Sequence, residues 1–152
     1  MTAFELAIRP LKKYFDFAGR ASRSEFWFFF FFVLLMQAVA RVVDAMFGSA
    51  LFFAGPFSML AAVLLFVPQL AVTVRRLHDV NRSGRDLVVP CLMLLVMPLF
   101  VMFRGVIAGI VALGYYGVVL LLFANLLLLL IKKGSKIPNR YGSSPSAFSF
   151  AG

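Results

Sequence analysis

Long apolar segments alternate with short basic ones along this chain, and that pattern limits the folds open to it. From Leu87 to Ile131, for example, the chain is apolar except for Arg104 and Asn125. Of the 152 residues, 62% are hydrophobic and only 14% are charged. A helix needs about 20 apolar residues to cross the hydrocarbon core of a bilayer. The sequence therefore predicts a polytopic membrane protein with one domain.

We expect an all-α membrane protein built as a four-transmembrane-helix bundle, with one membrane domain over residues 1–145. The expected spans are about 24–47, 56–76, 87–103 and 106–131. The third is short and carries Pro90 and Pro98, so it is expected to be kinked or only partly inserted. The apolar run from Phe26 is too long for a signal-peptide core, so the first span is expected to be retained.

Both ends of the chain differ from the spans. Residues 2–22 are expected to form a short N-terminal amphipathic interfacial helix, with a solvated cytoplasmic helix as the alternative. Pro10 is expected to divide it, because proline lacks an amide donor. The tail is the segment from residue 132 onward, and its last part, 142–152, is rich in Gly, Ser and Pro and is expected to be disordered.

The basic residues predict the topology. With four spans, all but Arg41 and Arg104 of the 15 lysines and arginines fall on one side of the membrane. The positive-inside rule then puts the N and C termini and the central loop in the cytoplasm. A three-span arrangement would export the basic tail and is disfavoured. The residues on the basic side are Arg9, Lys12, Lys13, Arg20, Arg23, Arg75, Arg76, Arg82, Arg85, Lys132, Lys133, Lys136 and Arg140.

Two places in the sequence have the spacing of a helix-starting capping box. Ser22 and Glu25 predict that the first span begins near Arg23, and Ser83 and Asp86 repeat the spacing after the central loop.

Polar residues inside the first two spans have expected structural roles. Arg41 and Asp44 are expected to pair at the far membrane boundary. Gln69 is expected to form a hydrogen bond between helices.

The most charged stretch is the central loop, residues 75–86. It holds four arginines, two aspartates and the only histidine. His78 beside Asp79 resembles a general base with its partner, but neighbouring residues on a helix point about 100° apart. No catalytic residues are therefore expected. Cys91 is the single cysteine, which rules out an internal disulfide and a multi-cysteine metal site, and no metal or cofactor is expected.

Three blocks carry a resemblance to a known family. They are residues 14–27 (YFDFAGRASRSEFW), residues 75–84 (RRLHDVNRSG) and residues 139–142 (NRYG). With the spans between them, the chain resembles domain-of-unknown-function family 805, the YhaH-like small bacterial inner-membrane proteins. The resemblance implies a location in the bacterial inner membrane, and it implies no particular activity.

All three blocks are expected on the cytoplasmic face, where their polar groups would be neighbours. The expected cluster, structural or binding a lipid or partner, is Arg20, Arg23, Glu25, Arg75, Arg76, His78, Asp79, Arg82, Asn139 and Arg140. Arginine suits such a cluster because its planar fork holds a carboxylate with two hydrogen bonds. Surplus arginines would leave donors for anionic lipid headgroups.

These observations favour a non-enzymatic integral inner-membrane protein of structural or interaction type. The expected partners are the lipid bilayer with its anionic lipids, and a membrane-protein partner or a second copy of the chain. Nucleic acid is not expected, because the charges flank apolar segments as topology signals do. A small transporter or channel subunit is the alternative, although the span centres lack the ionisable residue that substrate sites usually need. A membrane-embedded enzyme is a further alternative.

Overall fold

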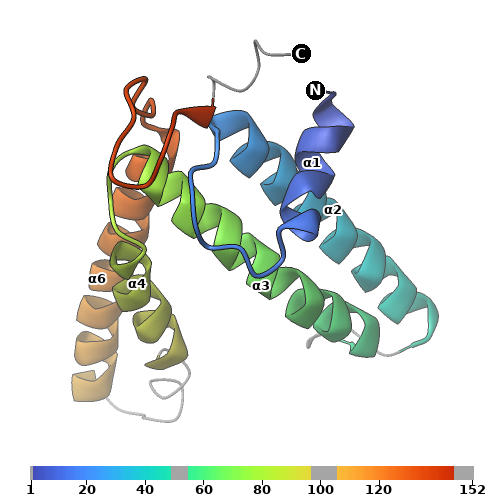
Figure 1. The fold of residues 1–152 in the computed structure, drawn as a ribbon. Helices are drawn as coiled ribbons and strands as arrows, with labels where there is room; N and C mark the ends of the chain where they lie inside the picture. The colour runs from blue at the N-terminus through green and yellow to red at the C-terminus, as the bar shows by residue number, and fades with distance from the viewer. Residues whose placement is uncertain (1, 49–54, 97–105, 146–152) are drawn as a thin grey trace.

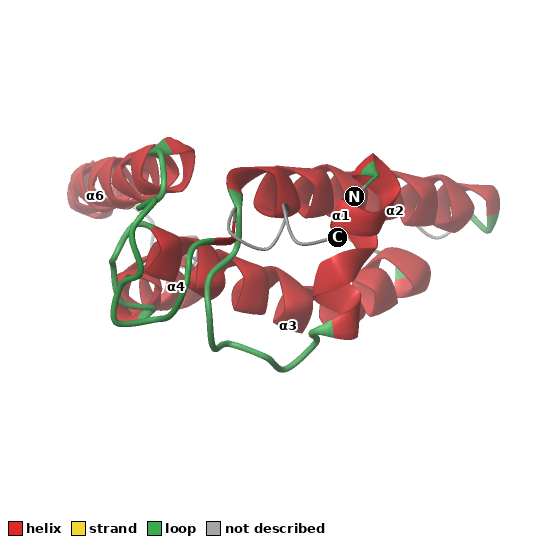
Figure 2. Ribbon diagram, turned by 45° about the horizontal axis from the view of Figure 1, so that its top comes forward, coloured by secondary structure: helices red, strands yellow, loops and turns green. Residues whose placement is uncertain are grey.

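The computed structural model describes residues 2–48, 55–96 and 106–145, and its regular structure in these ranges is helical (Figures 1 and 2). The one bridge outside helices joins Asn139 and Gly142. The all-α prediction is confirmed. The helices are α1 Ala3–Lys12, α2 Arg23–Met46, α3 Pro56–Asp79, α4 Arg85–Val96 and α6 Val106–Ile131.

Three of the described helices are long and apolar enough to cross a membrane. They are α2, α3 and the Gly109–Ile131 part of α6. Helix α4 has 12 residues and is about 18 Å long, which is short of a core roughly 30 Å thick. The rest of the expected third span, with Pro98, lies outside the described residues, as do Arg104 and the tail from residue 146. The chain is thus an α-helical membrane protein with three candidate spans in its described part.

The helices form two hairpins that meet at one end (Figure 1). Helices α2 and α3 pack along each other, α4 packs on α6, and α1 lies across α2 and touches α3. Helix α3 meets α6 near the end where the hairpins join, and from there the two hairpins diverge. The buried apolar core gathers the residues Ala21, Phe26, Phe29, Val72, Leu77, Leu126 and Leu130 from α2, α3, α6 and the segment before α2.

Helix α1 corrects one expectation from the sequence. Pro10 was expected to divide this segment, but α1 runs through it and Pro10 is buried. The helix tolerates the proline because it lies in the last turn and costs a single backbone hydrogen bond. At the other end, Thr2 and Glu5 form a reciprocal capping box that the sequence analysis did not single out.

The capping boxes predicted for the later helices form only in part. Ser22 Oγ accepts from the Glu25 amide at 3.1 Å, and α2 begins at Arg23 as predicted. The Ser83 hydroxyl accepts from the amide of Arg85 instead of Asp86, so the second box is wrong in its pairing.

Two polar groups inside the spans have surroundings that the sequence did not predict. Asp44 is fully buried, and its two oxygens accept from the amides of Phe57 and Ser58, each at 2.9 Å. It therefore caps the start of α3 from a neighbouring helix. The Oε1 atom of Gln69 is buried and has no hydrogen-bond partner among the described residues.

Candidate functional site

The first charged group at the joined end of the hairpins is centred on Asp79, the last residue of α3. Its Oδ1 accepts from Arg20 Nε at 3.0 Å and from Arg20 Nη2 at 2.8 Å. Its Oδ2 accepts from Arg76 Nη1. The Arg20 and Arg76 side chains are 1% and 0% exposed. We call Arg20, Arg76 and Asp79 the Asp79 group. Buried charges of this kind need close partners, because each loses its hydration.

The two arginines of the Asp79 group also bind backbone carbonyls near the end of the chain. Arg76 donates to the carbonyl of Leu130 at 3.1 Å and to that of Lys132. The last carbonyls of a helix lack partners within it and carry the negative end of its dipole. Arg76 therefore caps the end of α6 from α3.

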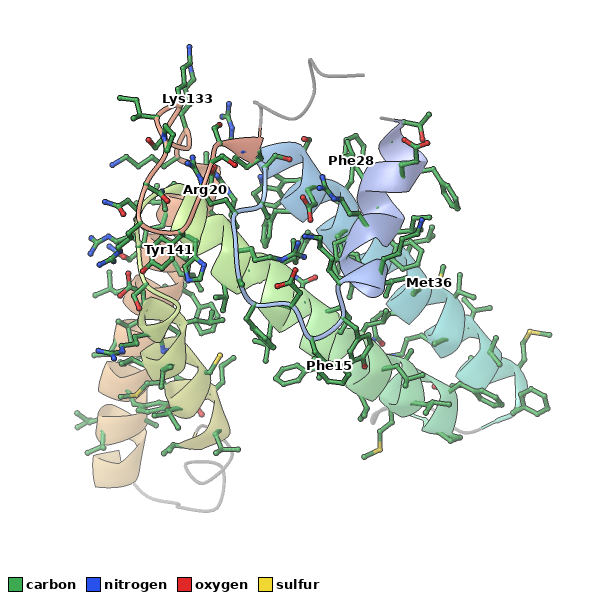
Figure 3. All side chains as sticks on the ribbon, viewed as in Figure 1. Phe15, Arg20, Phe28, Met36, Lys133 and Tyr141 are labelled. Atoms are coloured by element: carbon green, nitrogen blue, oxygen red, sulfur yellow. The ribbon has the colours of Figure 1, made fainter. Side chains whose placement is uncertain are left out.

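Arg20 also binds backbone carbonyls, in the segment that follows α6. It donates to the carbonyl oxygens of Ser135, Ile137 at 3.1 Å and Gly142 at 3.3 Å. Figure 3 shows Arg20 beside this segment, with Lys133 and Tyr141 at the same end of the molecule. One arginine from the N-terminal part thus binds three backbone carbonyls of the tail.

Gly134 brings the tail into direct contact with α3. A Cβ at this position would overlap the Asp79 carboxylate, so any other residue here would force one of the two to move. The next amide, that of Ser135, donates to the Asp79 carbonyl at 3.0 Å. The tail is therefore attached to Asp79 through its backbone as well as through Arg20.

The second charged group lies on the other side of α3, under α1. Arg75 donates to Glu25 at 3.1 Å, and Arg9 of α1 lies 3.6 Å from the other oxygen of Glu25. The Arg75 and Glu25 side chains are 1% and 2% exposed. Arg75 and Arg76 serve different groups because adjacent residues on a helix point about 100° apart. The Arg75 carbonyl also accepts from the Ala21 amide at 3.0 Å, which fixes the segment before α2.

His78 joins the central loop to the N-terminal segment and the tail. Its Nδ1 lies 3.1 Å from the Gly19 carbonyl, and its ring stacks on Tyr141 with centroids 3.8 Å apart. The side-chain amide of Asn139 donates to the His78 carbonyl at 2.9 Å. A carbonyl can only accept, so Nδ1 carries the proton and donates. Arg140 lies over the Tyr141 ring at 4.8 Å.

The structure brings most of the expected cluster residues together. Arg82 is the exception, because it lies at the start of the other hairpin, 3.9 Å from Asp86, and is exposed. Arg23 and Arg140 are exposed and belong to neither buried group. Gly134 and the carbonyl acceptors were not predicted, because a close approach of two backbone segments leaves no pattern in a single sequence. No set of three metal-ligating side chains is found in the described part of the chain.

Three long apolar helices, with charged groups gathered at one end, are typical of a small polytopic α-helical membrane protein. A family model described as "Protein of unknown function (DUF805)" matches residues 14–143, and the chain belongs to this family. The matched range contains both charged groups except Arg9.

Two inner-membrane proteins of a bacterium are similar to the chain. Inner membrane protein YhaI of Escherichia coli K12 is 40% identical over 75 residues, which are 49% of this chain and 60% of the relative. Inner membrane protein YhaH of the same organism is 36% identical over 78 residues, 51% of this chain and 64% of the relative. The chain thus spans less than two thirds of these relatives. No solved structure matches the chain significantly. The family, these relatives and the apolar helices assign the chain to the bacterial inner membrane.

Proposed function

We propose that this chain is a non-enzymatic inner-membrane protein of structural or interaction type. Its charged end fastens the N-terminal segment, the central loop and the tail into one rigid unit at the cytoplasmic membrane surface. The positive charge left over at this end is offered to anionic lipid headgroups or to a membrane-protein partner.

The Asp79 group carries this proposal. One buried carboxylate holds two arginines, and those arginines hold five backbone carbonyls between Leu130 and Gly142. Such a group stabilises the contact between chain segments, because each guanidinium nitrogen donates to an acceptor within the chain. Removing one member leaves a buried charge or buried carbonyls without a partner, at a cost of several kcal/mol.

The proposed topology has four spans, with both termini in the cytoplasm. Support comes from the charged segments, which belong to the N-terminal part, the central loop and the tail, and meet at one end of the molecule (Figure 3). The positive-inside rule assigns such an end to the cytoplasm. A reporter fused after Ile131 is expected to be active on the cytoplasmic side, and periplasmic activity would overturn the four-span topology.

The geometry around His78 favours this reading over an enzyme. In the arrangement described above, Nδ1 of His78 faces the Gly19 carbonyl and the oxygens of Asp79 face Arg20 and Arg76. A His–carboxylate catalytic pair would need these two residues to face each other.

The experiment compares Arg20→Ala with Arg82→Ala in the purified full chain. Each removes one arginine, but the Arg20 side chain is buried in the Asp79 group and Arg82 is exposed. Breaking a buried pair costs about 3–5 kcal/mol, whereas an exposed pair contributes about 0–1 kcal/mol. The melting temperature is expected to fall markedly for Arg20→Ala but not for Arg82→Ala. The tail of the Arg20→Ala variant is also expected to become sensitive to protease.

Equal melting temperatures for the two variants would contradict the structural role of the Asp79 group. Unchanged co-purifying lipid and protein in Arg20→Ala would count against the interaction role. The two readings can therefore fail separately.

A further inference from the structure

A cleft of about 210 Å³ lies between the start of α2 and the segment that follows α6. Its wall includes Ser22, Arg23, Asp79, Lys133, Ser135 and Lys136. It therefore joins two parts of the chain that are more than 100 residues apart. We call it the Lys133 cleft after one of its wall residues, which Figure 3 labels.

The cationic side chains of this cleft have no anionic partner among the described residues. Arg23, Lys133 and Lys136 are exposed, and their side chains form no ion pair with another described residue. Asp79 is the only carboxylate in the wall, and its oxygens are already held by the buried arginines of the Asp79 group. The cleft thus carries three positive charges with no counter-charge of its own.

The backbone adds to this positive potential. Ser22 is the N-cap of α2, and its hydroxyl serves the Glu25 amide, which leaves the amides at the very start of the helix without intrahelical acceptors. The positive end of the α2 dipole points to the same place. Charged side chains from two separate segments and a helix start therefore converge on one small volume.

The level of the cleft relative to the expected membrane indicates what it faces. The apolar part of α2 begins at Phe26 and α6 ends at Ile131, so the cleft lies just beyond the ends of two candidate spans. Trp27, one turn inside α2, is placed like an interfacial aromatic anchor. This is the depth at which the phosphates of a lipid leaflet lie.

We propose that the Lys133 cleft binds a phosphate group, carried either by an anionic phospholipid of the adjoining leaflet or by a soluble phosphate compound. Arginine can hold phosphate oxygens with two hydrogen bonds, and lysines supply point charges around it. This inference rests on the proposed function and sharpens it, because it assigns headgroup recognition to three exposed cations and not to the buried arginines.

The test uses the full chain in a neutral detergent, titrated by calorimetry with three ligands. These are a short-chain phosphatidic acid, a short-chain phosphatidylcholine and inorganic phosphate. The variant is Lys133→Gln with Lys136→Gln. The matched control, Lys12→Gln with Arg82→Gln, removes the same charge from exposed positions outside the cleft.

A saturable site for phosphatidic acid, with much weaker binding of phosphatidylcholine, is the expected result. Each cation near an anionic surface contributes roughly a fivefold change in affinity, so the cleft variant is expected to bind about 25-fold more weakly. The control should bind within about threefold of the native chain. If inorganic phosphate binds as tightly as the lipid, the soluble source is identified.

Two results would overturn the proposal: no saturable binding of either phosphate ligand, or equal losses in the cleft variant and the control. Lys133 and Lys136 are exposed, so their replacement should leave the melting temperature unchanged. Absent phosphate binding, together with the expected fall in the melting temperature of Arg20→Ala, would therefore reject the phosphate site. It would leave the structural role of the Asp79 group intact.

Discussion

Replacing Gly134 with alanine adds a single methyl group at the point where the tail meets α3. Its Cβ would overlap the Asp79 carboxylate, so one of the two must move. The backbone at Gly134 is not in the left-handed region, and alanine adds no conformational strain of its own. The cost is therefore the cost of displacing Asp79 from its partners.

The magnitude follows from what Asp79 would lose. It accepts two hydrogen bonds from Arg20 and one from Arg76, and both arginines are buried. Hydrogen bonds to charged groups contribute about 1.5–3 kcal/mol each, and part of this is recovered when the chain adjusts. We expect a loss of about 3 kcal/mol in the free energy of unfolding. For a chain of this size that corresponds to roughly 6–12 °C in melting temperature.

The assay is thermal unfolding in detergent, with Gly117→Ala as the matched control. A Cβ at Gly117 has no neighbour within 4 Å, so that variant should be neutral or slightly more stable. A melting temperature for Gly134→Ala within about 2 °C of the native chain would refute the reasoning. So would an equal fall in both variants, because the effect would then belong to glycine in general.

Other substitutions probe separate parts of the molecule. Asp44→Ala should lower the free energy of unfolding by about 1–2 kcal/mol, because the start of α3 loses its cap, and a change below 0.3 kcal/mol in a denaturant titration would contradict this role. Burial acts to raise the pKa of Asp16, but hydrogen bonds from Ala18 and Lys13 outweigh it and hold that pKa below its ordinary value of 3.8. A carboxyl with a lowered pKa stabilises above its ordinary pKa and loses that contribution as pH falls through the lowered value. Exchange of the Ala18 amide should therefore accelerate below about pH 4 relative to an Asp16→Asn variant, and identical profiles would contradict this. Liposomes holding the protein should pass no ions or small solutes, and a flux abolished by Gln69→Leu would favour the transporter alternative.

The sequence predicted those features that depend on local patterns. Apolar periodicity and length were enough for the all-α membrane class, and Ser22 marked the start of α2. The same local rule failed for Glu25, whose carboxylate serves Arg75 from another helix. A capping box describes only neighbours in the chain, and a buried arginine competes more strongly for a carboxylate than a backbone amide does.

The expected topology predicts that the charged segments lie at one end of the molecule. It does not predict which arginine pairs with which carboxylate. Arg20 and Asp79 are 59 positions apart, and nothing in the composition of the cluster distinguishes Asp79 from Glu25 as the partner of Arg20. The carbonyl acceptors are harder still, because every residue has one. Arg82 shows that the sequence can also mislead. Arg82 and Arg85 repeat the spacing of Arg20 and Arg23, yet Arg82 pairs with Asp86 at the start of the second hairpin.

The acceptors of Arg20 in the tail lie 115 to 122 positions further along the chain. During synthesis the guanidinium therefore emerges long before those acceptors exist. The charged end can therefore close only after α6 and the segment behind it have been made. A chain truncated before Ser135 would lack all three of these carbonyl acceptors and would leave the Arg20 guanidinium with Asp79 as its remaining partner.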